Sequence, residues 1–338
     1  GLQGYCVLPG DFNGDNIDDL FLHQYHSNTG LTTWLVKTGD GEGGYVSSTL
    51  SGSVTGYIGP NKISVVDFNG DGIDDVGVVL HILGTNNYTY KKITFTKTGS
   101  TTSTLAQNET GIFFLGYFKG MGQIQVLNRG TPQGHNTTLS LVGENVSLTV
   151  PTSGQIRVTD INGNGKSEVY VCHNSYFEVY EYDEALDDFS MILDQPHWMP
   201  YTTSIDALGD FNGDGAQDHV FVLGTKTYMR LSKGNDYTPP YRMMAYGDLP
   251  SDSPLLVSDI NGDGKDDIIR PVFNSTTQKL TLHVFYSRSY SDTIVGCDAI
   301  QIQNDDIFND AASMYLFSDI NHDGKNELFY MGSIYEDP

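Results

Sequence analysis

Basic residues are scarce in this chain. Lys and Arg number 18 against 42 Asp and Glu, and the formal net charge is −24. Nucleic acids and anionic membrane surfaces are bound through clustered basic side chains, so this balance argues against both as partners. Long hydrophobic runs are also missing, and no apolar segment approaches the roughly 20 residues of a membrane span. No secretory signal is visible, as expected of a mature or trimmed form that starts at Gly1.

Cysteine and tryptophan are rare as well, with three Cys and two Trp among 338 residues. No C-x-x-C pair occurs, which argues against a zinc site or a thioredoxin-type site. Cys172 ends an apolar stretch, so we expect it to be a buried thiol. Trp34 stands in the middle of an expected strand and is predicted to pack in the core, whereas Trp198 lies in a Pro-bounded segment and is a candidate ligand contact.

Many of the acidic residues of this chain lie in one repeated pattern, D-[FI]-N-[GH]-[DN]-[GN]-x-x-[DE]. We call this pattern the Asp loop and number its residues from position 1 to position 9. It occurs at residues 11–19, 67–75, 160–168, 210–218, 259–267 and 319–327. Oxygen donors at alternate positions of a turn are what a calcium ion needs for its six to eight ligands. Position 12 of the second copy is Val78 rather than the Glu of an EF-hand, so we expect each loop to join two strands.

We predict that about six calcium ions are bound, each by the side chains of positions 1, 3, 5 and 9 and the backbone carbonyl of position 7. Six ions would add 12 positive charges and leave about half of the net charge of −24. The expected ligands are Asp11, Asn13, Asp15, Ile17 and Asp19; Asp67, Asn69, Asp71, Ile73 and Asp75; Asp160, Asn162, Asn164, Lys166 and Glu168; Asp210, Asn212, Asp214, Ala216 and Asp218; Asp259, Asn261, Asp263, Lys265 and Asp267; and Asp319, Asn321, Asp323, Lys325 and Glu327.

The spacing of the loops exposes a hidden copy. The first Asp residues are 56, 93, 50, 49 and 60 residues apart, and the wide gap contains Gly116–Val126, which aligns with the pattern but has lost its acids. Its degenerate loop, 117–125, carries Lys119 at position 3, where the ammonium either replaces the charge of a cation or is simply solvated. Seven units of roughly 50 residues, each with short strands between Gly, Asn and Asp turns, predict an all-β fold, a seven-bladed β-propeller that forms a single domain over residues 1–338.

The expected strands of the first unit are Tyr5–Leu8, Leu20–His23, Leu31–Lys37 and Tyr45–Thr49, and Glu184–Asp194 is the only helix candidate. The last blade is incomplete, because only Met314–Phe317 and Leu328–Met331 belong to it. Either the native chain continues, or this blade is short, or another chain donates strands to its edge. Cys6 and Cys297 lie near the two ends of the repeats, where a disulfide would help to close the ring; two unpaired thiols are the alternative.

The Asp loops followed by apolar strands resemble the FG-GAP/VCBS repeats, a family that includes the seven-bladed head of integrin α chains and several fungal and bacterial propeller lectins. The resemblance spans residues 5–331 and implies calcium ligands at positions 1, 3, 5 and 9. The Gly-Ala-Pro segment of the family is absent, since residues 80–84 read LHILG and residues 221–224 read FVLG. Six acidic loops also exceed the few that are usual in integrin heads, which favours the wider VCBS group.

From these features we expect a secreted or cell-surface recognition or adhesion module, non-catalytic, that binds a glycan or an extracellular protein. An assembly subunit that self-associates through its incomplete blade, and a polysaccharide lyase or hydrolase, are the alternatives. No G-x-S-x-G or H-E-x-x-H motif supports an enzyme, and most carboxylates are assigned to calcium. Five N-x-[ST] sequons fit a secreted glycoprotein, at Asn87, Asn108, Asn136, Asn145 and Asn274.

Overall fold

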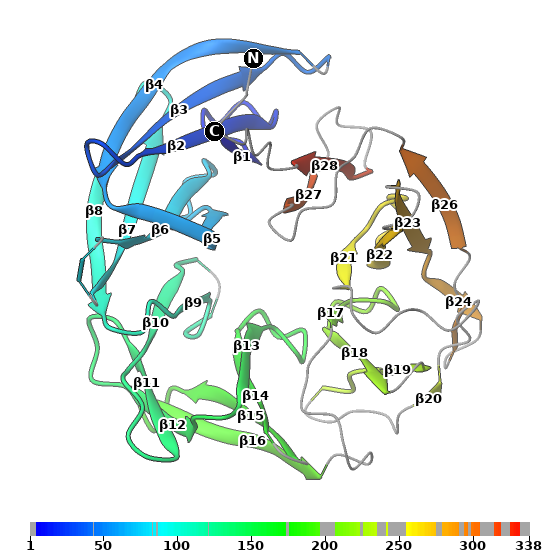
Figure 1. Ribbon diagram of the computed structural model, residues 1–338. Helices are drawn as coiled ribbons and strands as arrows, with labels where there is room; N and C mark the ends of the chain where they lie inside the picture. Colours follow the sequence, from blue (N-terminus) through cyan, green and yellow to red (C-terminus); the bar gives the residue numbers. More distant parts are fainter. Residues whose placement is uncertain are drawn as a thin grey trace.

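The chain folds into a ring of small antiparallel sheets that surround a central axis (Figure 1). The computed structural model describes residues 5–42, 44–82, 84–85, 87–120, 122–173, 176–196, 207–223, 226–234, 241–242, 255–274, 279–290, 294–296, 299–304, 314–318 and 325–331. The first strand of each sheet lines the inside of the ring and the fourth forms its outer wall. This is the β-propeller architecture.

Six sheets have four strands each, and we call them blades 1 to 6. Blades 1 to 3 comprise β1 (Cys6–Gly10), β2 (Asp19–His26), β3 (Leu31–Gly39) and β4 (Tyr45–Thr55); β5 (Tyr57–Val66), β6 (Asp75–His81), β7 (Tyr88–Thr96) and β8 (Gly99–Asn108); and β9 (Phe113–Gly116), β10 (Gln125–Arg129), β11 (Asn136–Leu141) and β12 (Ser147–Pro151). Blades 4 to 6 comprise β13 (Gln155–Thr159), β14 (Glu168–His173), β15 (Tyr176–Asp183) and β16 (Asp188–Pro196); β17 (Ala207–Gly209), β18 (Asp218–Leu223), β19 (Lys226–Arg230) and β20 (Tyr241–Arg242); and β21 (Leu256–Ser258), β22 (Asp267–Asn274), β23 (Lys279–Phe285) and β26 (Ala299–Asn304).

The predicted count of seven blades is wrong: the structure has six four-stranded blades, not seven. The seventh unit forms a two-stranded sheet of β27 (Met314–Ser318) and β28 (Glu327–Met331). Its inner strand β27 lies beside β1, so this sheet fills the place between blade 6 and blade 1 (Figure 1). Within the described ranges, β28 pairs with β27 alone, as expected for a unit with only two strand segments. Donation of strands by another chain stays a prediction.

A smaller feature completes the topology. A hairpin of β24 (Arg288–Tyr290) and β25 (Ile294–Gly296) is inserted between the third and fourth strands of blade 6.

The prediction of a helix at Glu184–Asp194 is wrong, because this segment is the turn between β15 and β16 followed by most of β16. The Asp183 carboxylate accepts the Ala185 N–H at 2.8 Å, and Asp187 has a left-handed φ of 50°. These local contacts favour a tight turn over a helix.

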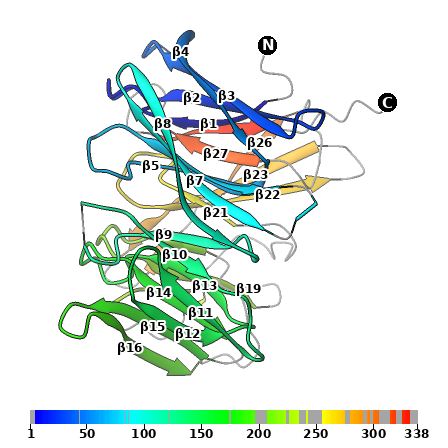
Figure 2. The ribbon, with the colours of Figure 1, turned by 90° about the vertical axis from the view of Figure 1, so that its left-hand side faces the viewer.

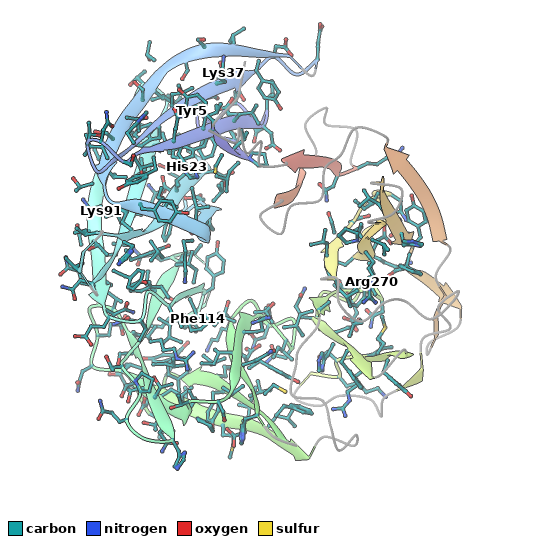
Figure 3. All side chains as sticks on the ribbon, in the orientation of Figure 1. Tyr5, His23, Lys37, Lys91, Phe114 and Arg270 are labelled. Carbon is teal, nitrogen blue, oxygen red and sulfur yellow. The ribbon has the colours of Figure 1, made fainter. Side chains whose placement is uncertain are left out.

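The core lies between the blades rather than inside one layer. In β6, Val76, Val78 and Leu80 pack toward blade 1, while Val79 packs toward blade 3. A strand that is buried on both faces reads as a continuous apolar run, which explains why β6 is apolar along most of its length. Figure 3 shows the side chains that fill these spaces.

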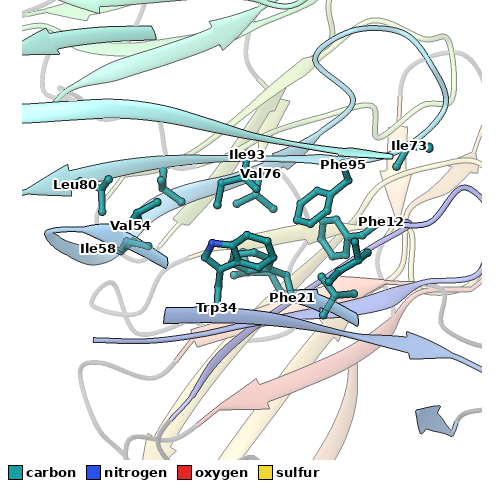
Figure 4. Close-up of a cluster of buried hydrophobic side chains, with 14 residues drawn as sticks. Phe12, Phe21, Trp34, Val54, Ile58, Ile73, Val76, Leu80, Ile93 and Phe95 are labelled. Carbon is teal, nitrogen blue, oxygen red and sulfur yellow. The ribbon is translucent and has the colours of Figure 1, made fainter. Parts of the chain in front are cut away.

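Blades 1 and 2 share the largest described cluster of apolar side chains (Figure 4). Trp34 is 4% exposed, stacks on Phe21 at 5.6 Å and meets Phe95 edge-on at 5.5 Å. This confirms its predicted place in the core. Cys172 is likewise buried, as predicted. None of the described residues forms a helix with the length and apolar character of a membrane span.

Candidate metal-binding loops

The five described acidic loops share one backbone conformation. Positions 4 and 6 are left-handed in each of them; in the second loop, φ is 75° at Gly70 and 81° at Gly72. Glycine adopts this conformation without steric cost. Asn16 replaces the second glycine in the first loop and keeps φ at 63°, which Asn tolerates better than other residues with a Cβ. The sixth loop lies outside the described residues at positions 1 to 6, so the predicted ligands Asp319, Asn321 and Asp323 are not placed.

Position 2 anchors most loops to the apolar core. In the loops of blades 1 to 5 the side chain there is at most 3% exposed and reaches the cluster that is shared with the next blade, whereas Ile260 of blade 6 is half-buried. Phe12, for example, lies 5.2 Å from Phe95 of blade 2, measured between ring centroids. The same position holds Phe68, Phe118, Ile161 and Phe211. The aromatic or aliphatic residue in the pattern therefore fixes the loop at the blade junction.

The carboxylate at position 1 gathers the N–H groups of its own loop. Asp67 accepts backbone hydrogen bonds from Gly70 at 2.7 Å and Gly72 at 2.8 Å, with longer ones from Asn69 and Asp71. Burial alone would raise the pKa of Asp67, but these four N–H donors outweigh it and hold the pKa below its usual value. Equivalent bonds occur at Asp11, Asp160, Asp210 and Asp259.

Positions 3 and 5 continue this pattern on the exposed side of the turn. Asn69 accepts the Asp71 N–H at 3.0 Å, and Asp71 accepts the Ile73 N–H at 2.9 Å. The backbone is thus bent so that the side-chain oxygens of positions 1, 3 and 5 all accept N–H groups of the same loop. In the sixth loop, Lys325 and the backbone of Glu327 are described, but the residues that they would join are not.

Position 9 is the buried centre of each loop. Asp19, Asp75, Glu168, Asp218 and Asp267 are 0% exposed. The Asp19 carboxylate accepts the N–H of Phe12 at 3.1 Å and the N–H of Gly39, at the end of the third strand, at 3.0 Å. A similar link is made by Phe95 near the end of β7 and by Ser232 and Ser287, each two residues beyond β19 and β23. In these blades one carboxylate therefore ties its loop to the end of the third strand or the residues just after it.

These buried carboxylates are poorly compensated in charge. Burial, reinforced in most by the neighbouring acids of the loop, raises the pKa of Asp19 to about 7 and of Glu168 to about 8. It raises the pKa of Asp218 to about 7, and of Asp75 and Asp267 to about 6. Asp75 Oδ2 and Glu168 Oε1 have no hydrogen-bond partner among the described residues. A buried carboxylate in this state needs either a proton or a cation.

The donor set fits a hard divalent cation. Carboxylate, amide and backbone carbonyl oxygens are calcium ligands, whereas zinc and copper prefer nitrogen and sulfur. Within the described part of the chain, no group of three or more His, Cys, Asp or Glu side chains is arranged to hold a metal. The position 1 carboxylates instead accept the N–H groups of their own loops, and the position 9 carboxylates are turned to backbone N–H groups as well.

The degenerate loop replaces acid by a lysine. Gly120 and Gly122 keep φ at 94° and 120°, and Gln125 at position 9 accepts the Lys119 N–H at 3.2 Å. The Lys119 ammonium pairs with Glu144 and lies 4.7 Å from the centroid of the Tyr182 ring of blade 4. The lysine is therefore engaged in specific contacts at the blade junction rather than simply solvated, and it supplies positive charge at a loop that has lost its acids.

Position 8 has a role that the sequence pattern did not reveal. Asp74 donates its N–H to the Asp11 carbonyl at 2.8 Å, and its carboxylate accepts the Asp11 N–H at 3.0 Å. The loop of blade 2 is thereby latched to the loop of blade 1. The pairs Ser167–Tyr117 and Asp266–Asp210 repeat both bonds. Gln217 makes only the N–H bond to the Asp160 carbonyl, and Asn326 donates its side-chain amide to the Asp259 carbonyl. Exposed loop positions are commonly polar, so the polar residues at position 8 gave no specific signal of this contact.

We expect Asp74→Ala to lower the free energy of unfolding by about 1–3 kcal/mol, because the Asp11 N–H loses its acceptor. Asp74→Asn should retain most of the stability, since it keeps an acceptor oxygen and removes the repulsion from Asp11 and Asp67. Urea unfolding at saturating calcium measures both variants. Equal losses in the two variants would mean that the carboxylate oxygen is not acting as the latch.

The other candidate residues are distributed over the surface. Asn87, Asn136 and Asn145 are exposed and open to glycosylation. The Asn108 amide donates to the carbonyls of Ile112 and Arg129 at 3.2 and 3.1 Å, so this sequon is a poor acceptor. The Asn274 side chain, Trp198 and Cys297 lie outside the described residues, and the proposed ligand contact and disulfide are therefore not placed. Cys6, the other half of that pair, is exposed.

The end of the ring opposite the Asp loops has a different chemistry. A cleft of about 550 Å³ between blades 3 and 4 has a described lining of Gly134, His135, Asn136, Pro151, Thr152, Ser153 and His173. The Glu178 carboxylate lies 3.3 Å from the imidazole of His173. His219, which directly follows position 9 of its Asp loop, is fully buried, with its ring 3.3 Å from the Tyr170 hydroxyl.

Comparisons with known proteins support the repeat and the fold. Residues 11–78 match the family described as FG-GAP-like repeat. No curated protein matches the chain. Among solved structures, the chain is similar to an Agrocybe aegerita lectin, described as specifically recognising non-reducing terminal N-acetylglucosamine, with a TM-score of 0.63 and 12% identity over 98% of this chain and 86% of that one.

Two further structures are more distant. The core factor of S. cerevisiae has a TM-score of 0.50 and 11% identity, over 99% of this chain and 58% of that one. An exotype rhamnogalacturonan lyase has a TM-score of 0.45 and 12% identity, over 90% of this chain and 66% of that one. At such low identities, structural similarity concerns the fold and leaves the choice between binding and catalysis open.

Proposed function

We propose that this chain is an extracellular, calcium-stabilised recognition module that binds glycans without catalysis. The observation that carries the calcium part is the set of five loops with one geometry, each built around a fully buried carboxylate. The ions would be held by positions 1, 3, 5, 7 and 9, about six in the whole chain. Bound calcium supplies positive charge to clustered carboxylates, so its expected role is structural.

The chain's own residues prepare each loop for such an ion. Glycines or Asn at positions 4 and 6 bend the backbone, position 2 anchors it in the core, and position 9 joins it to the third strand. Position 8 then connects neighbouring loops. Filling one site would therefore stiffen its own blade and the junction to the next.

Glycan recognition is supported by two observations. The lectin from Agrocybe aegerita shares the fold over nearly the whole chain, and the face opposite the Asp loops offers a cleft with neutral polar and imidazole groups. Neutral hydroxyl-rich ligands suit such a surface better than anionic ones, given the net charge of −24. An extracellular setting fits the millimolar calcium that loops of this kind need.

A glycan array probed with the intact chain at 1–2 mM calcium tests the proposal. We expect binding to a restricted set of neutral glycans, and loss of that binding in excess EDTA because the ring loosens. A parallel screen for cleavage of acidic polysaccharides should show no product. Absence of any glycan binding by folded, calcium-loaded protein would refute the recognition part, and polysaccharide cleavage would refute the non-catalytic part.

A further inference from the structure

Two aromatic ring pairs lie at neighbouring positions of blades 1 and 2, and we call their four rings the aromatic row: Tyr25, Tyr57, His81 and Tyr88. Tyr25 of β2 meets Tyr57 of β5 edge-on, with ring centroids 5.3 Å apart. Tyr57 and His81 are directly opposite each other on β5 and β6, and His81 in turn is opposite Tyr88 on β7. The His81 and Tyr88 rings stack at 4.7 Å with an interplanar angle of 21°.

The aromatic row lies at the end of the blades that is remote from the Asp loops. β6 leaves its loop at Asp75 and ends at His81, while β5 starts at Tyr57 and runs toward the same loop. Tyr25 is six residues beyond Asp19 on β2, which at the rise of a strand is about 20 Å. Figure 2 shows these strands side on. The row therefore belongs to the same end of the ring as the cleft between blades 3 and 4.

The aromatic row is open to solvent, and its tyrosine side chains are uncharged. Tyr57 is 37% exposed and the neighbouring Ile82 41% exposed, while Tyr25, His81 and Tyr88 are half-buried. Tyrosine presents an apolar ring with a hydrogen-bonding tip. His81 is fixed by a bond of 2.8 Å between Nε2 and the Thr85 carbonyl, so the stack on Tyr88 is held in place. Preorganised rings lose little conformational entropy when a ligand binds.

These properties match a saccharide better than a protein or an ion. The apolar C–H face of a pyranose packs on aromatic rings, and its hydroxyls bond to polar ring edges. The two ring pairs, with centroid distances of 5.3 and 4.7 Å, are linked through the cross-strand neighbours Tyr57 and His81, so the row is longer than one sugar ring and suits a short oligosaccharide. A protein partner would need a wider contiguous apolar patch than this narrow row.

We propose that the aromatic row of Tyr25, Tyr57, His81 and Tyr88 is a binding platform for a neutral oligosaccharide. The inference rests on the proposed glycan recognition and assigns it to these side chains. Two sources could supply the same chemistry: a glycan of another molecule, or a glycan carried by this chain at Asn87, which is exposed and directly precedes Tyr88.

The test compares glycan-array binding of the intact protein with that of Tyr57→Ala and Tyr25→Ala. Losing one ring contact should weaken binding about tenfold. Tyr57→Phe, which keeps the ring, should retain most of the affinity. Tyr117→Ala is the matched control, because it removes a half-buried tyrosine from the Asp-loop end. Unchanged melting temperatures at saturating calcium show that all four variants are folded.

Asn87→Gln separates the two sources, since it removes the sequon and leaves the rings. Equal binding by the wild type and Asn87→Gln supports an external glycan, and binding only by Asn87→Gln supports occupation of the row by the chain's own glycan. If the wild type binds but both Tyr→Ala variants bind equally well, the row is refuted while glycan recognition stands. If neither the wild type nor Asn87→Gln binds any glycan, both proposals fail.

Discussion

Removal of calcium should lower the melting temperature by roughly 5–15 °C. Extracellular calcium sites have Kd values on the order of 10⁻⁴–10⁻³ M, so at about 1 mM calcium each site adds roughly 0.4–1.4 kcal/mol. Six sites then contribute roughly 2–8 kcal/mol, comparable with the whole stability of a typical domain, about 5–15 kcal/mol. At about 2 °C per kcal/mol, this gives the expected shift. Differential scanning calorimetry measures this shift by comparing the protein in about 2 mM calcium, which is at or above the expected site Kd, with the protein in excess EDTA.

Two controls make this result specific. Back-titration with calcium should restore the melting temperature, and magnesium at equal concentration should restore less because it demands tighter octahedral geometry. Hydrogen exchange offers an internal comparison. The backbone amides of the loops after β5 and β13 should exchange faster in EDTA than in calcium, whereas those of the degenerate loop after β9, which Lys119 holds, should exchange at the same rate in both. A melting temperature that is the same in calcium and in excess EDTA would contradict a structural role for the ion.

The sequence predicted the inner half of each repeat well. The acidic pattern, its glycines and the apolar residues that follow determine local structure over about ten residues, so β1, β2, β27 and β28 lie where they were expected. The hidden repeat at Gly116–Val126 was recovered because its spacing and glycines survived the loss of acids. Local signals of this kind depend little on the rest of the fold.

Features that depend on neighbouring blades were missed. The motif count gave seven units, but a blade needs four paired strands, and the seventh unit has two described strands. The latch of Asp74 on Asp11 joins residues 63 positions apart, which no pattern within one repeat reveals. The contacts of Lys119 with Glu144 and Tyr182 likewise require two blades to be packed together. The aromatic row is another example, since its rings come from four strands of two repeats.

In the absence of calcium, stability should fall as the pH rises from 5 to 8, a direction opposite to that of most acid-denatured proteins. The five buried position 9 carboxylates have pKa values raised by burial, to between about 6 and about 8. The folded state then binds protons more tightly than the unfolded chain, where these groups titrate near pH 4. Their contribution is complete below about pH 4 and is lost as the pH rises through 6 to 8.

A shift of only one pKa unit in each of the five groups is worth about 1.4 kcal/mol per group, or about 7 kcal/mol in total. At about 2 °C per kcal/mol, this corresponds to roughly 14 °C in melting temperature. Melting curves in EDTA between pH 5 and pH 8 measure the effect. Saturating calcium should reverse the slope, because the ion competes with protons for the same oxygens. A melting temperature in EDTA that rises over this interval would contradict the expected titration.

General repulsion among the acids also weakens at low pH, so the slope alone does not identify the buried carboxylates. Asp218→Asn separates the two causes. It removes one buried titrating group from blade 5 and keeps an acceptor oxygen for one of the two N–H groups, of Phe211 and Ser232, that the carboxylate binds. The pH slope in EDTA should become shallower in this variant. Asp214→Asn removes the same charge from an exposed position of the same loop and should change the slope less. Equal slopes in the two variants would assign the pH dependence to overall charge rather than to the buried centres of the loops.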